Sequence, residues 1–272
     1  MSGLDGELRV LWAAAVVYVA AGTLAIFGVM LGRRPERAVL GLLVLALALH
    51  GASIALRWQR LGHGPFITLF EILSSNVWSL TFVFTLAYWR IRPLRPSAAV
   101  VVPILFVLLG WMLVSHPGRG FFPPTYDTVW LYVHVFLGKV FLGTVLVAVG
   151  LAGAILLRAV GWGGALRRMP DDRSLEELAY RFMGVGLIFD SLMLVAGAIW
   201  AQDAWGRYWA WDPLETWAFV TWLLLGFAIH TRITLRPRPA AAAALVCIVF
   251  GVAFLTFFGV PFVSRVPHQG AI

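Results

Sequence analysis

The chain has 272 residues, of which 61% are hydrophobic and only 12% are charged. A soluble domain is about 45–50% apolar and about 25% charged, so a 30.0 kDa globule could not hide this much apolar side chain from water. The composition therefore excludes an ordinary soluble protein and predicts one that crosses a membrane several times. The single cysteine, Cys247, excludes an internal disulfide and any redox or zinc centre built from several cysteines.

Eight segments are long and apolar enough to cross about 30 Å of hydrocarbon, which takes about 20 helical residues. They are Leu8–Leu31, Ala38–Leu56, Ile72–Trp89, Ser97–Ser115, Trp130–Leu157, Phe182–Trp200, Trp217–Ile233 and Ala240–Phe258. We therefore predict an all-α fold, a polytopic membrane helix bundle of about eight helices that forms one membrane domain over residues 1–272. The first segment is too long for a signal peptide, so we expect it to be retained.

The net charge of +8 comes from arginines that alternate between loops. Fourteen arginines lie in or beside the loops at 32–37, 90–96, 158–181 and 232–239, and six lie in the remaining loops and termini. Basic loops stay in the cytoplasm, so this pattern predicts that both termini lie outside a bacterial cytoplasmic membrane. The excess of basic residues is therefore explained by the orientation of the chain in a lipid bilayer, and it does not indicate a nucleic-acid partner.

The loop before the sixth segment ends in a helix-start signal. Ser174 and Glu177 have the spacing of a capping box, in which the two side chains satisfy each other's backbone N–H groups. We therefore expect the sixth helix to begin at Ser174, before it enters the lipid.

Residues 200–217 hold five of the chain's 13 tryptophans. One interpretation is an interfacial belt, because tryptophan gathers at membrane surfaces. A second interpretation follows if the stretch is helical. Trp205, Trp209 and Asp212 would then share one side and form an aromatic shelf that suits a planar macrocycle.

The same stretch carries a start signal for the seventh helix. Asp212 is placed to be the N-cap, Pro213 to be the first helical residue, and Glu215 to lie at the third helical position. For Asp212 and Glu215 we favour this structural role over direct contact with a ligand.

The tryptophan-rich stretch also carries a resemblance. The sequence Trp-Gly-Arg-Tyr-Trp-Ala-Trp-Asp-Pro-Leu-Glu-Thr-Trp at 205–217 resembles the WWD signature of haem-handling cytochrome c assembly proteins, and within them the CcsA (ResC) family. Three further segments resemble that family: Arg57-Trp58 with Gly62-His63-Gly64-Pro65 and Leu69-Phe70-Glu71, Trp130-Leu-Tyr-Val-His134-Val135, and His230-Thr-Arg232. The resemblance extends from about residue 45 to the C-terminus.

The resemblance implies roles for three of the six histidines. His134, one turn into the fifth helix, and His268, in the outer tail, would ligate haem iron from its two faces at the level of the tryptophans. His230, near the inner end of the seventh helix, would be an intramembrane haem ligand whose partner belongs to the companion protein CcsB (ResB). We expect His50 to be a core histidine. The residues alone suggest no role for His63 and His116.

The implied function is that of the haem-handling membrane subunit of a cytochrome c synthase. With a CcsB (ResB) partner, it would move haem b to the outer, periplasmic face and present it to the CxxCH thiols of apocytochrome c. The sequence holds no pattern of a catalytic nucleophile or acid–base pair. The candidate haem-binding residues are His134, His268, His230, Trp205, Trp209, Trp211, Asp212 and Arg207, the last for the haem propionates. Two alternatives stay open: a CcmC-like haem exporter or delivery chaperone without ligation activity, and a membrane b-type cytochrome that carries electrons.

Overall fold

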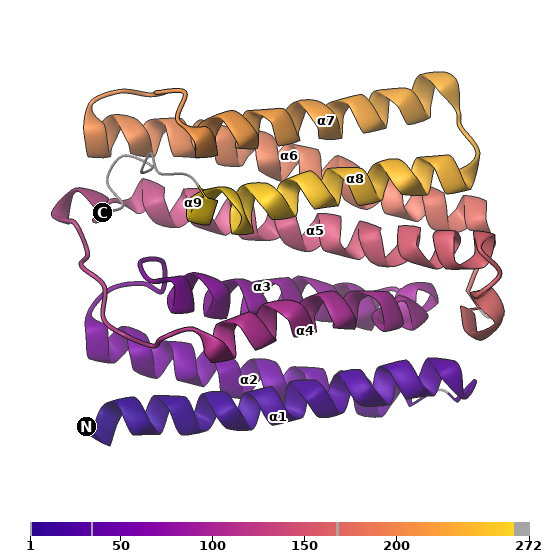
Figure 1. The fold of residues 1–272 in the computed structure, drawn as a ribbon, viewed down its shortest axis with the longest axis horizontal. Coiled ribbons are helices and arrows are strands. Elements are labelled where there is room, and N and C mark those ends of the chain that lie inside the picture. Colours follow the sequence, from indigo (N-terminus) through magenta and orange to yellow (C-terminus); the bar gives the residue numbers. More distant parts are fainter. Residues whose placement is uncertain (1, 34, 167–168, 264–272) are drawn as a thin grey trace. The chain divides into compact units, whose positions relative to one another are not determined.

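The computed structural model describes residues 2–33, 35–166 and 169–263, and this part of the chain is helical and contains no strand. Within it, eight helices are long and apolar enough to cross a membrane, which confirms the predicted fold class. They are α1 (Ser2–Met30), α2 (Glu36–Leu61), α3 (Leu69–Arg90), α4 (Ala98–Val114), α5 (Val129–Ala159), α6 (Asp172–Trp205), α7 (Pro213–Leu235) and α8 (Pro239–Phe258), shown in Figure 1. Short helical turns complete the described chain: η1 (Arg92–Ser97), η2 (Pro124–Tyr126), η3 (Gly163–Leu166) and α9 (Val260–Val263).

The helices form two compact units. Unit 1 comprises Met1–Phe122 and Val160–Pro170 and contains α1–α4, and unit 2 comprises Pro123–Ala159 and Asp171–Ile272 and contains α5–α9. Consecutive long helices within each unit run in alternating directions (Figure 1). The start of α5, the end of α6, the start of α7 and the end of α8 therefore share one end of unit 2.

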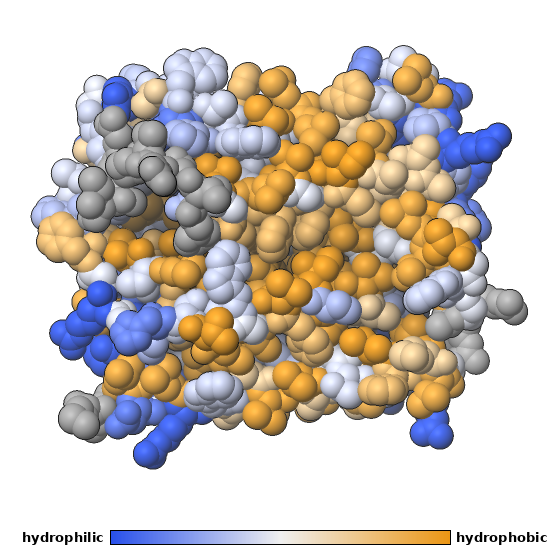
Figure 2. Space-filling model, viewed as in Figure 1, coloured by the Kyte–Doolittle hydropathy of each residue, from blue (hydrophilic) through white to orange (hydrophobic). Residues whose placement is uncertain are grey.

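Side-chain hydropathy follows the pattern of membrane helices. Hydrophobic residues cover the middle of the helices and hydrophilic residues gather at their ends (Figure 2). Large apolar side chains such as Val16, Phe82, Val107 and Ile188 are exposed within these helices. Exposed apolar surface on this scale is stable in lipid and not in water, and the protein is a multi-pass membrane protein.

The core of unit 1 contains the histidine that was expected to be structural. His50 is fully buried on α2, and its Nε2 lies 2.9 Å from Ser74 Oγ. Its Nδ1 lies 3.4 Å from the hydroxyl of Tyr18, whose ring meets the imidazole edge-on. Both ring nitrogens are thus used inside unit 1, which confirms His50 as a core residue.

Unit 2 is organised around the long seam between α5 and α6, where glycines let the two helices approach closely. A Cβ on Gly138 of α5 would lie 2.9 Å from Met193 Sδ, and a Cβ on Gly186 of α6 would lie 3.2 Å from Thr144 Oγ1. Helices that lack a hydrophobic driving force in lipid associate through such small residues. The adjoining helices α7 and α8 are linked by a hydrogen bond of 2.9 Å between Thr221 and Thr256.

The start of α6 corrects one expectation. The helix begins at Asp172, with Asp171 as its N-cap, and Asp171 Oδ1 accepts hydrogen bonds from the N–H groups of Arg173 and Ser174 at 3.0 Å. Ser174 therefore lies inside the first turn, and the capping box predicted at Ser174 is wrong. Aspartate is as good an N-cap as serine, and the aspartate comes first in the chain.

Candidate functional site

The tryptophan-rich stretch lies at the end of unit 2 where α6 ends and α7 begins (Figure 1). The stretch is not one helix, because α6 ends at Trp205 and Gly206 takes the left-handed conformation, with φ of 71°, that terminates helices. Residues 207–212 form a loop before α7. The prediction of an aromatic shelf assumed one helix through Trp205, Trp209 and Asp212. That prediction is wrong, because only Trp205 is helical.

The predicted start of α7 is confirmed. Asp212 Oδ1 accepts a hydrogen bond of 2.9 Å from Glu215 N–H, and Pro213 is the first helical residue. Glu215 Oε2 in turn accepts one of 2.7 Å from the N–H of Ala210 in the loop. Both carboxylates are buried. Asp212 and Glu215 thus fix the loop to the helix.

The geometry around His134 selects one tautomer of its ring. Nδ1 lies 2.9 Å from the backbone carbonyl oxygen of Met193 on α6. A carbonyl oxygen only accepts, so Nδ1 carries the hydrogen and the ring's lone pair lies on Nε2. Metal-binding histidines are oriented in the same way, by donating the N–H that is not used for the metal.

A glycine on α6 makes room for this ring. A Cβ built on Gly197 would lie 2.7 Å from His134 Nδ1 and 2.8 Å from its Cε1, which is closer than real side chains approach. The histidine therefore lies against bare helix backbone, and its orientation depends on the absence of a side chain at Gly197.

Aromatic rings continue from His134 towards the loop. The imidazole stacks on Trp200 with centroids 6.0 Å apart and an interplanar angle of 17°. Trp200 meets Trp205 edge-on at 5.0 Å and Tyr126 of η2 edge-on at 5.1 Å. Burial raises the pKa of Tyr126 to about 12, so its phenol is neutral at physiological pH. Trp200 was missed as a site residue, although it opens the tryptophan-rich stretch.

Trp209 and Trp211 form a second aromatic cluster. Their rings meet edge-on with centroids 5.6 Å apart and an interplanar angle of 81°, and both meet Phe219 of α7 edge-on. Trp211 is 67% exposed and has a φ of 60°, a left-handed conformation that costs a bulky residue energy. The three predicted tryptophans thus lie in one end of unit 2, as edge-to-face pairs and not as a flat shelf.

The loop also holds buried donors without acceptors. Among the described residues, Arg207 Nε and Nη2 and the indole Nε1 of Trp209 are buried and have no hydrogen-bond partner. Such a donor costs about 1–3 kcal/mol, and more when it is charged. A guanidinium with unused N–H groups is suited to a carboxylate. Two further arginines lie in the predicted outer loops: Arg119 is exposed in unit 1, and Arg265, like His268, lies outside the described residues.

His230 is not brought together with His134. It lies 17 residues after Pro213, which places it about 26 Å along α7 from the loop. Its side chain is exposed, and its Nε2 lies 3.4 Å from Thr234 Oγ1.

Unit 1 carries an ionic cluster that sequence reasoning missed. The buried Arg57 of α2 pairs with Glu7 of α1 and Glu71 of α3, each at 2.9 Å, and Arg60 also pairs with Glu7. Arg57 donates further to the backbone oxygens of Pro117 and Gly118 after α4. The cluster therefore joins all four long helices of unit 1 at one end. The 14-residue separation of Arg57 and Glu71 in one recognisable segment could have suggested this pair.

The neighbouring loops of unit 1 carry the two remaining histidines. His63 donates from Nδ1 to the carbonyl oxygen of Gly64 at 2.9 Å and stacks on Phe122 with centroids 5.4 Å apart. His116 is exposed. No group of three or more potential metal ligands forms among the described histidine, cysteine and acidic residues.

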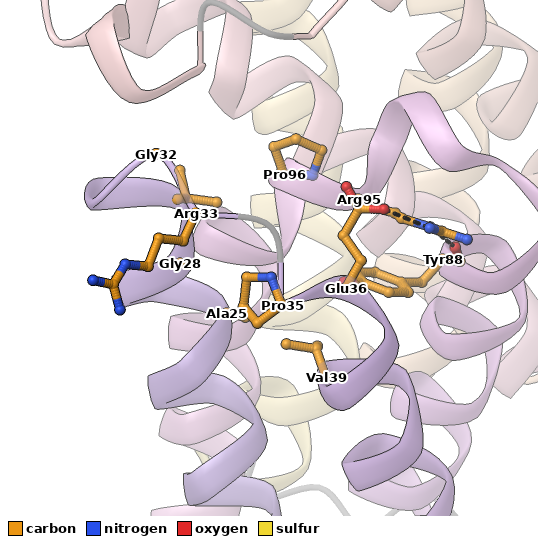
Figure 3. Close-up of a pocket in the computed structure, with 11 residues that line it drawn as sticks. Ala25, Gly28, Gly32, Arg33, Pro35, Glu36, Val39, Tyr88, Arg95 and Pro96 are labelled. Carbon is orange, nitrogen blue, oxygen red and sulfur yellow. Dashed lines mark hydrogen bonds and ion pairs between the residues drawn. The ribbon is translucent and has the colours of Figure 1, made fainter.

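Two hollows in unit 1 do not fit a haem. One, of about 50 Å³, is lined by Tyr88, Glu36 and Arg95, with Arg95 and Glu36 paired at 2.5 Å (Figure 3). It has room for a water molecule or two. The other is an apolar groove of about 410 Å³ between α2 and α3, lined by Trp78, Phe82 and their neighbours without histidine or arginine. The end of unit 2 remains the better candidate because it combines a fixed histidine, aromatic rings and unused cationic donors.

Comparison with known proteins gives consistent results. The family described as cytochrome C assembly protein matches residues 38–268. A cytochrome c biogenesis protein CcsA from Synechococcus sp. (strain CC9902) is 30% identical over 278 residues, covering 90% of each chain. The CcsA of Chlamydomonas reinhardtii is 28% identical over 79% of this chain, which spans 63% of that protein. The solved structure of cytochrome c haem lyase CcmF shares the fold, with a TM-score of 0.74 at 20% identity over 95% of this chain and 47% of that one.

Proposed function

Because the chain belongs to the cytochrome c assembly protein family, we propose that it is the haem-handling membrane subunit of a cytochrome c synthase. It would act in a bacterial cytoplasmic membrane with a CcsB (ResB) type partner. The protein would carry haem b to the outer face and present it to the CxxCH segment of apocytochrome c. The observation that carries the proposal is the tautomer of His134, which places the lone pair on Nε2 beside the aromatic rings.

The residues of unit 2 fit haem in three respects. The hydrogen bond to Met193 prepares His134 to bind iron through Nε2. Trp200, Trp205, Trp209 and Trp211 supply aromatic surface at the same end of unit 2. The unused N–H groups of Arg207 match a propionate carboxylate. The second outer ligand in this proposal is His268.

His230 fits an earlier step in the same proposal. An exposed histidine within a membrane-spanning helix is costly unless it has a function. Its exposure on α7 leaves it accessible to a second protein, which supports a ligand pair shared with the CcsB partner. The distance of about 26 Å along α7 then separates an inner haem position from an outer one.

The chain's contribution to the reaction is positioning. Bound haem supplies two vinyl groups, to each of which a cysteine S–H of the apocytochrome adds, with sulfur bonded to one carbon and the hydrogen to the other. His134 and Arg207 would hold the macrocycle in place, and the loop bound by Asp212 and Glu215 would keep the tryptophans in position. The chain's only cysteine, Cys247, lies within α8, so the thiols come from the substrate.

The central experiment replaces His134 by glycine and measures haem content and cytochrome c yield in cells. We expect maturation to be lost while some haem stays bound through His230. Added imidazole can enter the space left by the side chain and bind iron, so it should restore part of the yield. Normal maturation by His134→Gly would overturn the assignment of His134 as a ligand.

The same cells distinguish the two alternative functions. A haem exporter would pass haem to a recipient without forming thioether bonds, so a covalent haem product formed by this chain distinguishes the synthase from the exporter. A b-type cytochrome would retain its haem, and its haem would not pass to a recipient. A pyridine haemochrome assay separates covalent from non-covalent haem and decides between the three.

The predicted topology is tested with reporter fusions. Fusions after Arg95 and Arg236 should report a cytoplasmic location, and a fusion within residues 202–207 an external one. The inverted pattern would place the site on the wrong side of the membrane for apocytochrome thiols and would overturn the proposal.

A further inference from the structure

A buried acid on α6 has no role in the proposed function so far. Asp190 is 0% exposed, and among the described residues neither of its carboxylate oxygens has a hydrogen-bond partner or an ion pair. An ionised carboxylate in such surroundings is strongly disfavoured unless a positive charge comes near. Ionisable residues inside a membrane span are uncommon and are usually functional.

The position of Asp190 relates it to His134. Gly186, Asp190, Met193 and Gly197 follow one another at spacings of four, three and four residues, so they lie on one side of α6. Contacts place this side against α5: Gly186 at Thr144, Met193 at Gly138, and Gly197 at His134. Asp190 thus lies on the same seam as His134. It precedes Met193, whose carbonyl accepts the His134 hydrogen bond, by about one helical turn, and it lies about 10 Å along the helix axis from Gly197.

The charged groups around this seam are few. On α5 the titratable side chains are Tyr132, His134, Lys139 and Arg158, and Lys139 directly follows Gly138, the glycine that meets Met193. On α7, the titratable groups are Glu215 in the first turn, and His230 and Arg232 near the end. On α8 the titratable side chain is Cys247. None of these forms an ion pair with Asp190.

We propose that Asp190 is the internal counter-ion for ferric haem held by His134. This inference rests on the proposed function. Ferric iron in a porphyrin dianion leaves one net positive charge on the haem core, and ferrous iron leaves none. In this proposal, ferric haem raises the fraction of Asp190 that is ionised, and reduction of the haem lowers that fraction. At a separation equal to the Asp190–Gly197 spacing of about 10 Å, a carboxylate favours the cationic form on the order of tenfold at an effective dielectric constant of about 20, and a longer distance to the iron lowers this figure.

Each electron that enters the haem is accompanied by proton uptake at Asp190. When a one-electron reductant reduces the iron, the haem core loses its positive charge and Asp190 takes one proton from solvent. When the iron is oxidised, the electron leaves and the proton is released. An ionised Asp190 therefore lowers the midpoint potential of the haem, and the potential falls as pH rises through the range in which Asp190 changes its charge.

The test is a reductive titration of the purified full-length protein, loaded with haem, using dithionite at mildly acidic to mildly alkaline pH. Asp190→Asn should raise the midpoint potential by the equivalent of about tenfold in the ratio of ferric to ferrous affinity, or about 59 mV for a one-electron couple. The difference should vanish at acidic pH, where Asp190 is protonated in both states. Asp190→Glu should keep both the lower potential and its pH dependence.

Ser191→Ala is the matched control, because Ser191 is the next residue on α6 but accepts a hydrogen bond of 2.8 Å from Trp222 on α7. It should leave the potential unchanged. Thermal unfolding without haem is the second readout: a neutral acid without partners has no bond to lose, so Asp190→Asn should unfold at the same or a higher temperature. A marked loss of stability would make Asp190 structural and overturn the inference.

The two proposals fail differently. If wild-type protein shows no six-coordinate haem spectrum that depends on His134, the proposed function fails and this inference fails with it. If that spectrum is present in wild type and in Asp190→Asn, but both have the same potential at every pH, only the counter-ion role of Asp190 is wrong.

Discussion

Two groups of charged side chains, one in each unit, differ in whether the chain itself supplies their partners. In unit 1, the Arg57 cluster satisfies its charges internally, with Glu7, Glu71 and two backbone carbonyls around one guanidinium. In unit 2, the buried Nε and Nη2 of Arg207 and both carboxylate oxygens of the buried Asp190 have no hydrogen-bond partner among the described residues. A satisfied cluster holds helices together, whereas unsatisfied donors and acids are retained where a ligand completes them. This difference supports the proposal that unit 1 is a scaffold and that haem binds to unit 2.

The largest expected effect separates the buried Arg57 from the half-buried Arg207. Arg57→Ala leaves Glu71 as an uncompensated buried charge and Glu7 with Arg60 as its one remaining ion pair, and should destabilise the protein by about 3–5 kcal/mol. Arg207→Ala removes a guanidinium that lacks acceptors, so it should not destabilise the haem-free protein but should weaken haem retention. Denaturant unfolding in detergent and haem content give the two readouts.

Arg60→Ala is the control within unit 1. Arg60 also pairs with Glu7 but is partly exposed, so its replacement should lower the free energy of unfolding by less than Arg57→Ala does. If Arg57→Ala and Arg207→Ala destabilise the haem-free protein equally, the division into scaffold and binding unit is wrong.

The second effect tests the space around His134. Gly197→Ala introduces a Cβ 2.7 Å from His134 Nδ1, so the ring must move and its hydrogen bond to Met193 must weaken. Losing the group that orients a metal ligand typically costs about 10–100-fold in affinity, and we expect haem retention at the outer site to fall by that amount. Gly184→Ala on the same helix is the control, because a Cβ there meets nothing within 4 Å. Equal haem retention in the two variants would contradict the assignment.

Sequence reasoning predicted the eight membrane helices, because length and hydropathy decide them in lipid. It also predicted the caps at Asp212 and Glu215, since capping depends on residues close in sequence. It failed where distant contacts decide. The edge-to-face rings of Trp200 and Trp205 depend on where Gly206 ends α6, and the pairing of Arg57 with Glu7 depends on how α1 packs on α2. The sequence likewise does not reveal that Gly197 and Asp190 lie on the α5–α6 seam with His134, because this depends on how α5 and α6 are aligned along their length.

A smaller effect concerns the strained tryptophan of unit 2. Trp211→Gly should relieve the positive φ, which favours the haem-free fold by about 1 kcal/mol, while the lost edge-to-face contacts with Trp209 and Phe219 offset this gain in part or in full. If the ring contacts haem, the same change should lower haem retention by up to about tenfold, because an aromatic contact contributes about 0.5–1.5 kcal/mol beyond its area. Trp162→Gly, at an exposed tryptophan without positive φ in unit 1, should show neither gain nor loss. Unchanged haem retention in Trp211→Gly would make Trp211 a membrane anchor only.

The smallest expected effect on stability concerns Asp171, the N-cap at the other end of α6. Its carboxylate is exposed but accepts several hydrogen bonds. Hydrogen bonds from the Ser174 hydroxyl and backbone, and from Arg173 N–H, hold the pKa of Asp171 below its ordinary value. A lowered pKa means that the ionised cap stabilises the folded state at neutral pH, and that this contribution is lost as pH falls through the lowered pKa. The stability gap between wild type and Asp171→Ala should therefore narrow at acidic pH, with haem retention at neutral pH unaffected. Asp171→Asn keeps a capping oxygen without a charge, so its gap to Asp171→Ala should not change with pH. If acid unfolding of wild type and Asp171→Ala runs in parallel throughout, the ionised cap makes no measurable contribution, and the contrast between partnered and unpartnered groups applies only to buried ones.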